Sequence, residues 1–366
     1  MVKKRSTQII LIIFSLIALS IVLSIPFIIN KFNWSLTETG VSRDIVTDSN
    51  NNIITLCYDD YFDAEGYIIR EIKIFKYNIL GNKLWEVKWL EGKSAFPIAI
   101  TLDSDDNIYA VGSYNEENYL KFDVIILKYS KNGDLEWSRR WDKSKRDQPR
   151  GIDCDSENNV YITGEIVNET ENRNDIFLLK YDTNGTLQWS KCITEGESES
   201  GRAIIIDNND FIYLGLSKNY NESALIKFNK LGNIMNKTKW MRDSGCSIIK
   251  MDKDVNNNIY MASRGNLKSF NNKTKVILNL SITEDTRDVA VDSYGRIYVA
   301  HSCSSYSDYC IDIYSNPGRL FYRITYTTSG YLRLISIAID NLDDLLLLGD
   351  NWNTIYRTIL LVKISF

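Results

Sequence analysis

The residues that could carry chemistry in this chain are few and scattered. His301 is the only histidine among 366 residues, so a histidine general base or metal ligand could come from that position alone. It aligns with Gly112, Gly164 and Gly349 in an internal repeat, at a strand end that should open on a face of long loops. No acidic partner recurs beside it, so an incidental polar residue is the leading interpretation and a catalytic base is the alternative.

Metal and cofactor motifs are also sparse. Asp103, Asp105 and Asn107 resemble part of a calcium-binding loop, but the glycine and the downstream glutamate of that motif are missing, and an Asx turn explains them. The six cysteines contain no CxxC pair, so we predict no metal site and no bound cofactor. Cys303 and Cys310 flank a short polar loop, at a spacing that permits a disulfide in an oxidising compartment.

The elements that would position these residues come from a sequence repeat. An aspartate is followed five residues later by an aliphatic residue that opens an apolar run, as in TLDSDDNIYAVG, and this pair occurs seven times. A second pattern, an aromatic residue four positions before a turn glycine, occurs between these aspartates in most copies. The seven anchor aspartates are Asp48, Asp103, Asp155, Asp207, Asp254, Asp292 and Asp340.

The content of each copy predicts the fold. Four short apolar runs are separated by Asn, Asp and Gly turns, as expected of four antiparallel strands. Seven copies predict an all-β protein, a seven-bladed β-propeller of four-stranded antiparallel blades. A single meander is disfavoured because open sheets rarely exceed about ten strands. The seventh copy ends after its third strand, so we expect the orphan segment Phe32–Gly40, with its strand around residues 32–38, to complete the last blade.

The copies resemble a known repeat family. Their pattern, D-S-x-x-N-I-Y-x-x-G followed by I-x-L-x-K-Y-D-x-x-G-x-L-x-W-S, is similar to the SBBP repeats of bacterial and archaeal seven-bladed propellers. It resembles more distantly the tryptophan-bearing repeats of quinoprotein-like propellers. The resemblance covers residues 32–366 and implies an exported propeller without a catalytic residue set. A quinoprotein dehydrogenase would also need an adjacent cysteine pair, which the sequence lacks.

The first thirty residues predict a membrane anchor. The uncharged run from Ile9 to Ile29 follows Lys3, Lys4 and Arg5 and could, as a helix, cross a hydrocarbon core of about 30 Å. The excess of positive charge before this run places the N-terminus in the cytoplasm and the propeller domain, residues 31–366, outside. A cleaved signal peptide in residues 1–30 is the alternative and would make the protein secreted. We therefore expect a single-pass protein of the cell membrane.

Loop lengths indicate which face of the propeller binds. The connection between the second and third strands varies in length from copy to copy, whereas the short turns keep their length, so function is expected on the long-loop face. The longest loops are acidic and contain tyrosines, so they are either solvated loops without a ligand or a binding surface for an extracellular protein, a carbohydrate or a cation. A net charge of −4 disfavours nucleic acid. The candidate ligand-binding residues are Asp59, Asp60, Tyr61, Asp63, Glu65, Tyr114, Glu116, Glu117 and His301.

The sequence thus predicts a binding or scaffold module rather than an enzyme. The alternative is a propeller lyase, hydrolase or quinoprotein-like dehydrogenase with its site at the mouth of the central channel. Acidic side chains that converge with His301 in a water-filled funnel would favour the enzyme. A broad, shallow, tyrosine-rich surface would favour binding.

Overall fold

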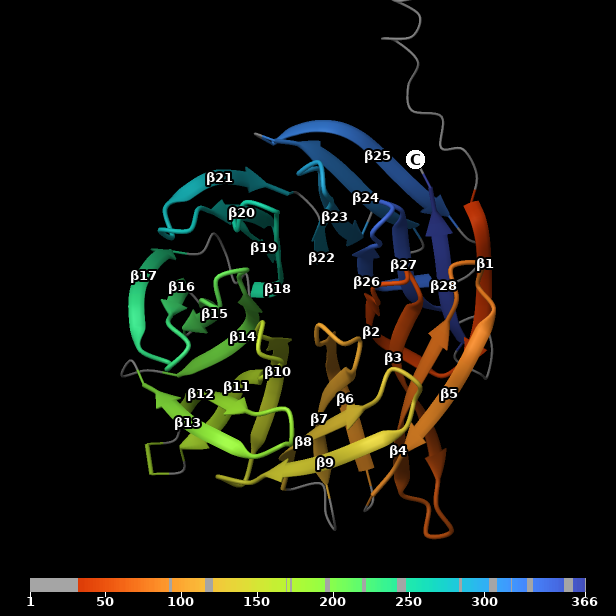
Figure 1. The fold of residues 1–366 in the computed structure, drawn as a ribbon, viewed down its shortest axis with the longest axis vertical. Helices are drawn as coiled ribbons and strands as arrows, with labels where there is room; N and C mark the ends of the chain where they lie inside the picture. The colour runs from red at the N-terminus through yellow and green to blue at the C-terminus, as the bar shows by residue number, and fades with distance from the viewer. Residues whose placement is uncertain are drawn as a thin grey trace, which may run out of the picture.

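Small antiparallel sheets surround a common axis, and Figure 1 views the molecule along that axis. This computed structural model describes residues 32–91, 94–115, 121–168, 170–171, 173–194, 198–218, 222–241, 248–282, 285–302, 308–316, 318–327, 332–351 and 358–365. These residues form 28 strands in seven sets of four. A single parallel bridge between Arg70 and Ser94 joins the first two sets into one sheet. The seven sets are the blades of a β-propeller.

Each blade has an inner strand next to the axis, followed by a second, a third and an outer strand. The inner strands are β2 (Val41–Thr47), β6 (Ser94–Leu102), β10 (Asp147–Cys154), β14 (Glu199–Ile206), β18 (Ile248–Lys253), β22 (Thr286–Val291) and β26 (Leu332–Ile339). The second strands are β3 (Ile53–Phe62), β7 (Ile108–Asn115), β11 (Val160–Asn168), β15 (Ile212–Lys218), β19 (Ile259–Ser263), β23 (Ile297–Ser302) and β27 (Leu345–Asn351). The third strands are β4 (Ile68–Tyr77), β8 (Asp123–Tyr129), β12 (Arg173–Tyr181), β16 (Glu222–Phe228), β20 (Asn266–Phe270), β24 (Asp308–Ser315) and β28 (Thr358–Ile364). The outer strands are β5 (Lys83–Trp89), β9 (Leu135–Trp141), β13 (Leu187–Ile193), β17 (Ile234–Met241), β21 (Val276–Ser281), β25 (Arg319–Thr327) and β1 (Phe32–Thr39).

The last blade contains strands from both ends of the described chain. β1 pairs antiparallel with β28, with Thr37 opposite Leu360, and forms one sheet with β26 and β27. Figure 1 shows β1 in red beside the blue β28. This pairing covers a sheet edge of β28 that would otherwise be open. The predicted anchor, residues 1–30, lies outside the described residues, and none of the described residues forms a helix long and apolar enough to cross a bilayer.

The hydrophobic core lies in layers between neighbouring blades. Between the third and fourth blades, for example, Tyr161 and Leu178 pack in one cluster with Ile204 and Leu214. The third strands are apolar on both faces because each blade is covered on both sides, and every residue of β8 is buried. The outer strands alternate between covered and exposed positions, as expected at the rim of the ring.

The anchor aspartates shape the turns between the inner and second strands. The Oδ1 atom of Asp103 accepts hydrogen bonds from the N–H groups of Asp105, at 3.0 Å, and Asn107, at 2.9 Å. Its Oδ2 atom accepts from the side-chain amide of Asn107 at 3.0 Å. This is an Asx turn, and the equivalent N–H groups bond to the other six anchor aspartates in the same way. The Asx turn predicted for Asp103, Asp105 and Asn107 is therefore present.

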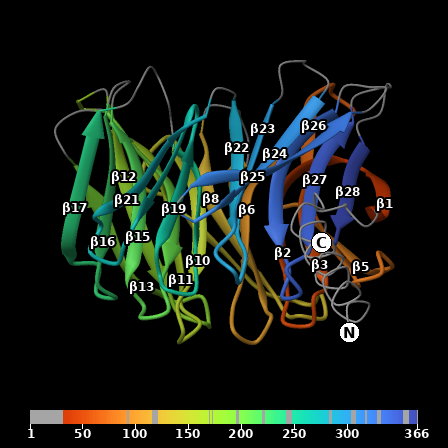
Figure 2. The ribbon, with the colours of Figure 1, turned by 90° about the horizontal axis from the view of Figure 1, so that it is seen from above.

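These turns and the hairpin turns between third and outer strands share one face of the ring, which we call the short-turn face. They gather along the lower edge in Figure 2. The opposite face carries the connections between second and third strands and the links from blade to blade, and we call it the long-loop face. The two faces therefore differ in construction as the loop lengths predict.

Hydrogen bonds on the short-turn face tie six of the seven described Asx turns to the next blade. Asp106 accepts from the N–H of Ser49 at 2.9 Å and from its hydroxyl at 2.6 Å. The linked pairs among the seven described turns are Ser49–Asp106, Ser104–Asn158, Ser156–Asp210, Asn208–Asn257, Ser293–Asp343 and Asn341–Asn51. Val255 and Gly295 occupy the two positions between blades five and six, where they have no polar side chain for this link. The ring of links is open at that one junction.

Candidate functional site

A β-bulge in every inner strand positions the side chains of the central channel. In β2 the pairing with β3 shifts register between Ser42 and Asp44, and the other six inner strands shift at the equivalent place. A bulge re-aims the side chains next to it. The residues that follow the bulge all line one cavity on the axis and are Asp44, Ala99, Gly151, Ala203, Lys250, Asp288 and Ser336.

One side of this ring is a charged network. The Nζ atom of Lys250 in blade five lies 2.7 Å from Oδ1 of Asp44 in blade one. The hydroxyl of Ser336 lies 2.6 Å from Oδ2 of Asp288 and 3.1 Å from Oδ1 of Asp44. Both carboxylates are almost fully buried, with exposures of 2% for Asp44 and 3% for Asp288. Lys250 thus reaches across the channel and connects blades that are not neighbours.

The channel aspartates also hold adjacent blades together. Asp44 accepts a hydrogen bond from the N–H of Ile100 in the next blade at 3.2 Å, and Asp288 accepts one from Ile337 at 2.9 Å. Two residues further along other inner strands, Asp153 accepts from Ile206 and Asp252 from Val291, each at 2.7 Å. Buried carboxylates are retained when several donors satisfy them, and here the donors come from two blades.

Burial dominates the electrostatics of these groups. It raises the pKa of Asp288, although the positive charge of Lys250 partly offsets the rise. Burial would lower the pKa of Lys250, but the charges of Asp44 and Asp288 raise it overall, so the ammonium group stays charged at neutral pH. Burial raises the pKa of Asp252 to about 7. The carboxyl of Asp252 can therefore exchange a proton near neutral pH.

The opposite side of the ring is open space. Ala99, Gly151 and Ala203 supply no long side chains there, and the cavity has a volume of ≈ 460 Å³. Arg150 and Arg202 also line it, so both signs of charge face the lumen. The cavity can hold a small polar molecule, whereas the part of its lining that the structure describes contains neither histidine nor cysteine, the usual bases and nucleophiles.

Five of the predicted ligand-binding residues lie together on one hairpin. The segment expected to be a loop is an extension of β3 and β4, in which the carboxylate of Asp63 closes a tight turn by accepting the N–H groups of Glu65 and Tyr67. Tyr61 and Glu65 are exposed. Two further acids of this hairpin are bound within it, since Asp59 pairs with Lys73 at 2.9 Å and Asp60 with Arg70 at 3.0 Å.

Two other predicted residues are buried instead of facing a ligand. Tyr114 belongs to β7, where it is 5% exposed and lies against Trp89 with ring centroids 6.2 Å apart. His301 is fully buried in blade six, with Nε2 3.3 Å from Oδ2 of Asp312, and it does not line the cavity. The same carboxylate binds Arg323 at 2.5 Å. The alignment of His301 with glycines in other copies showed its place in the strand, but glycine has no side chain to indicate a direction.

Three predicted residues have no described position of their own. Glu116, Glu117 and Cys303 lie outside the described residues. Cys310 is disulfide-bonded, and its pairing with Cys303 stays a prediction. The remaining cysteines in described strands, Cys57, Cys154 and Cys192, are free thiols.

Sequence reasoning missed the channel network, although a signal for it exists. Asp44, Lys250 and Asp288 each stand four residues before an anchor aspartate, at the position that is alanine or glycine in blades two to four. A charged residue at a repeat position that is otherwise small, inside a strand, would have marked these residues as facing a common space.

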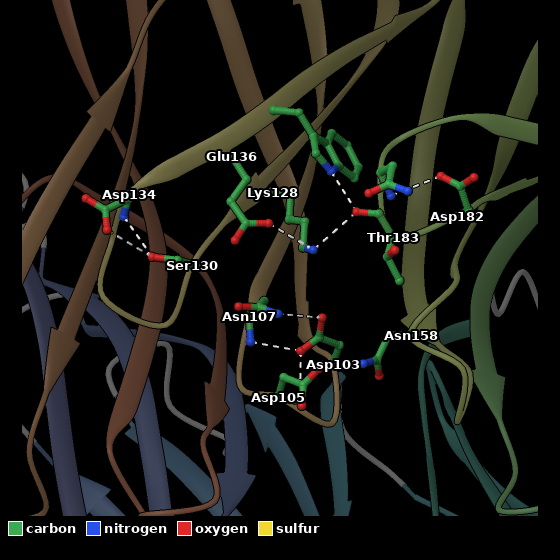
Figure 3. Close-up of polar contacts among 12 residues, drawn as sticks. Asp103, Asp105, Asn107, Lys128, Ser130, Asp134, Glu136, Asn158, Asp182 and Thr183 are labelled. Atoms are coloured by element: carbon green, nitrogen blue, oxygen red, sulfur yellow. Dashed lines mark hydrogen bonds and ion pairs between the residues drawn. The ribbon is translucent and has the colours of Figure 1, made fainter.

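The tryptophans of the outer strands fill junctions between blades on the short-turn face. The indole N–H of Trp137 donates to the carbonyl of Thr183 in the next blade at 3.0 Å. Figure 3 shows this junction, in which Lys128 also approaches that carbonyl while pairing with Glu136. The turn glycine is required here, because a Cβ on Gly185 would lie 2.9 Å from the indole. The recurrent lysine and tryptophan are therefore parts of the scaffold.

Comparisons with known proteins add to this account. No protein-family model matches the sequence. An uncharacterized WD repeat-containing protein of Acanthamoeba polyphaga mimivirus is 26% identical over 172 residues, a match that covers 34% of this chain and 12% of the mimivirus protein. The chain therefore corresponds to only a small part of that relative's length.

Two solved structures share the fold at low sequence identity. The WD40 domain of Pan2 from Neurospora crassa has a TM-score of 0.58 and 10% identity, with 89% of this chain and 90% of that chain covered. Sqt1 from Chaetomium thermophilum has a TM-score of 0.53 and 10% identity, with 86% and 82% covered. The chain is a β-propeller repeat protein. These likenesses concern the fold of the propeller, and the SBBP repeat family specifically stays a prediction.

Proposed function

We propose that this propeller is a binding or scaffold module that holds a partner protein on its long-loop face. The observation that carries the proposal is the tip of the β3–β4 hairpin, which extends beyond the rim at the bottom of Figure 1. Four large apolar side chains are exposed there, with Tyr61 at 43%, Phe62 at 73%, Tyr67 at 49% and Ile68 at 37%. Clustered apolar exposure of this kind marks interaction surfaces.

Side-chain contacts support the base of the hairpin. The guanidinium groups of Arg43 and Arg70 lie over the ring of Phe96, at 4.1 and 5.4 Å from its centroid. Arg43 also donates to the hydroxyl of Tyr58 at 3.1 Å. A hairpin held in one conformation loses little conformational entropy on binding, which favours affinity.

The charge around the tip indicates the chemistry of the partner. Asp63 and Glu65 lie beside the exposed rings, and Glu71 follows on β4. A surface with an apolar pocket and a basic rim would match this combination, because the pocket would take the rings and the rim would steer association. Tyrosines and carboxylates can also contact a carbohydrate, but the exposed apolar side chains of Phe62 and Ile68 match a protein pocket better.

We further propose that the module works outside the cell membrane, held by residues 1–30 as a helical anchor. The support is the uncharged run after Lys3, Lys4 and Arg5 in the sequence. An enzyme is the second candidate, and the observation in its favour is the polar cavity that contains Asp252. His301 would not be its base, because that side chain lies in the blade.

Replacing Phe62 with serine is expected to weaken partner binding by a factor of about 30 or more, because truncating a central aromatic anchor costs about 2 kcal/mol. Folding should change by less than about 0.5 kcal/mol, since the side chain is 73% exposed. The measurement is the mass, by light scattering after chromatography, of the full-length protein extracted gently from its own cells. Wild type should elute as a complex and the variant as a free chain.

Leu342→Ser provides the matched control, because Leu342 is 58% exposed on the short-turn face. This variant should retain the complex. A complex of unchanged mass in Phe62→Ser, or a free chain in the wild type, would contradict the proposal.

A further inference from the structure

The junction between blades one and two on the short-turn face departs from the other tryptophan-bearing junctions. It contains a cleft of ≈ 310 Å³, at the low end of the volumes of about 300–1,000 Å³ common for small-molecule sites. The lining residues from blade one include Leu84, Trp85 and Asn50, and those from blade two include Lys131 and Asn132. This cleft lies on the face opposite the long loops and away from the central channel.

The next junction shows how the same position is closed elsewhere. In it, Arg139 lies over the ring of Trp137, 5.3 Å from the centroid, and donates to the carbonyl of Gly185 at 2.7 Å. Trp189 in the following junction is covered by Lys191 at 5.6 Å. The residue two positions after the tryptophan is Val87 in blade one, which cannot make either contact. The indole of Trp85 therefore has no cationic side chain from its own strand over it, and instead Lys76 of β4, which is paired with Asp48, lies 5.9 Å from its ring centroid.

Among the described residues, the polar side chains that are hydrogen-bonded to each other in the second junction have equivalents in the first that are not bonded to each other. Figure 3 shows Asp105 next to Asn158, whose side-chain amide donates to it at 2.9 Å. The equivalent of Asp105 in the first blade is Asn50. Within the described part of the chain the side chains of Asn50 and Asn132 make no hydrogen bond, so their amide groups remain available as donors and acceptors.

The charge of the cleft restricts its ligand. Lys76 and Lys131 supply two positive charges, and Asp48 and Asp106 supply two negative ones. Lys76 and Asp48 are already paired at 2.9 Å, and Asp106 is bound to the neighbouring Asx turn. The cleft is thus neutral overall, with an apolar surface from Leu84 and Trp85 and a rim of free amides, which suits an uncharged molecule with one apolar and one hydrogen-bonding side.

We propose that this cleft binds a pyranose sugar. The C–H surface of the ring lies against the indole of Trp85, and the hydroxyl groups exchange hydrogen bonds with the amides of Asn50 and Asn132. The site is separate from the proposed protein-binding hairpin, so either proposal can fail without the other. The valine at position 87 keeps the cleft open, because an arginine there would fold over the indole as Arg139 does at Trp137.

Saturation-transfer NMR on the full-length protein tests this proposal with glucose, galactose, mannose and N-acetylglucosamine. At least one sugar should receive saturation at its ring C–H protons from the wild type. The signal should disappear in Trp85→Ala and in Val87→Arg. Trp137→Ala, which removes the equivalent indole from the closed junction, should keep the signal.

Val87→Arg makes the test decisive even where Trp85→Ala fails to fold, because the arginine adds a contact found in the next blade and should leave the melting temperature equal or higher. A signal that survives in folded Val87→Arg protein, or in folded Trp85→Ala protein, would overturn the proposal. Absence of signal for all four sugars in the wild type would overturn it as well.

Discussion

Lys250→Met is expected to destabilise the protein by about 2–4 kcal/mol at neutral pH. The ammonium group lies 2.7 Å from Asp44, and Asp288 is buried beside it, so the substitution leaves two carboxylates without their counter-ion. Breaking a fully buried pair costs about 3–5 kcal/mol. We expect somewhat less because the Lys250 side chain is 35% exposed to the lumen, where water screens its charge. Denaturant unfolding measures the difference.

The pH dependence of this effect follows from Asp288. Burial raises its pKa above the value of about 3.9 in the unfolded chain, so ionisation of Asp288 opposes folding as the pH rises through the folded pKa. The positive charge of Lys250 stabilises the ionised carboxylate and so reduces this loss of stability. The deficit of Lys250→Met should therefore be largest at neutral pH and shrink as the pH falls to about 3, where Asp288 is mostly protonated in both states.

Lys230→Met is the control for this experiment. Lys230 and its partner Glu157 are more than half exposed and 3.4 Å apart, so the loss should be within about 0.5 kcal/mol at any pH. A Lys250→Met protein as stable as the wild type at pH 7 would show that the network across the channel contributes nothing to stability.

The second large effect on stability is expected from closing the open link between blades five and six. The double variant Val255→Ser, Gly295→Asp should form the hydrogen bonds that join Ser49 to Asp106, with a coupling energy of about 1–2 kcal/mol for this exposed pair. Space is available, because a Cβ on Gly295 would meet no atom within 4 Å. The φ of +75° at Gly295 is close to the +65° that Asp106 adopts.

The single variants complete this thermodynamic cycle. Val255→Ser alone should have little effect, and Gly295→Asp alone should lower stability because an aspartate at positive φ is strained without its partner. The opposite test is Asp106→Ala, which should cost about 1–2 kcal/mol by removing an existing link. Additive effects of the two single variants would mean that the turns on this face do not couple the blades.

The fold could be predicted from the sequence because its determinants recur. The anchor aspartate, the turn glycine and the tryptophan each act within one copy or on the next, as Asp103, Gly185 and Trp137 show. Seven repetitions of a local pattern therefore specify blades and ring together. The extension of β3 and β4 into one long hairpin was not predicted, because Asp59 and Asp60 are unfavourable strand residues whose ion pairs appear only in the paired strands.

The candidate site was harder to predict because its residues come from different copies. Asp44, Lys250 and Ser336 are far apart in sequence and meet only when the ring forms. Tyr114 and His301 show the opposite error, since their positions near long loops indicated exposure, while Tyr114 is buried between blades one and two and His301 is buried within blade six. The direction of a side chain at a strand end depends on strand register and on bulges. The spacing of the anchor aspartates reveals neither.

The most direct test of the central claim is site-specific photo-cross-linking from the hairpin tip in intact cells. A photoreactive residue at position 62 should give discrete adducts with a partner protein, whereas the same residue at position 342, on the short-turn face, should give none. Absence of adducts from position 62, or the same adducts from both positions, would contradict a role for the long-loop face in holding a partner.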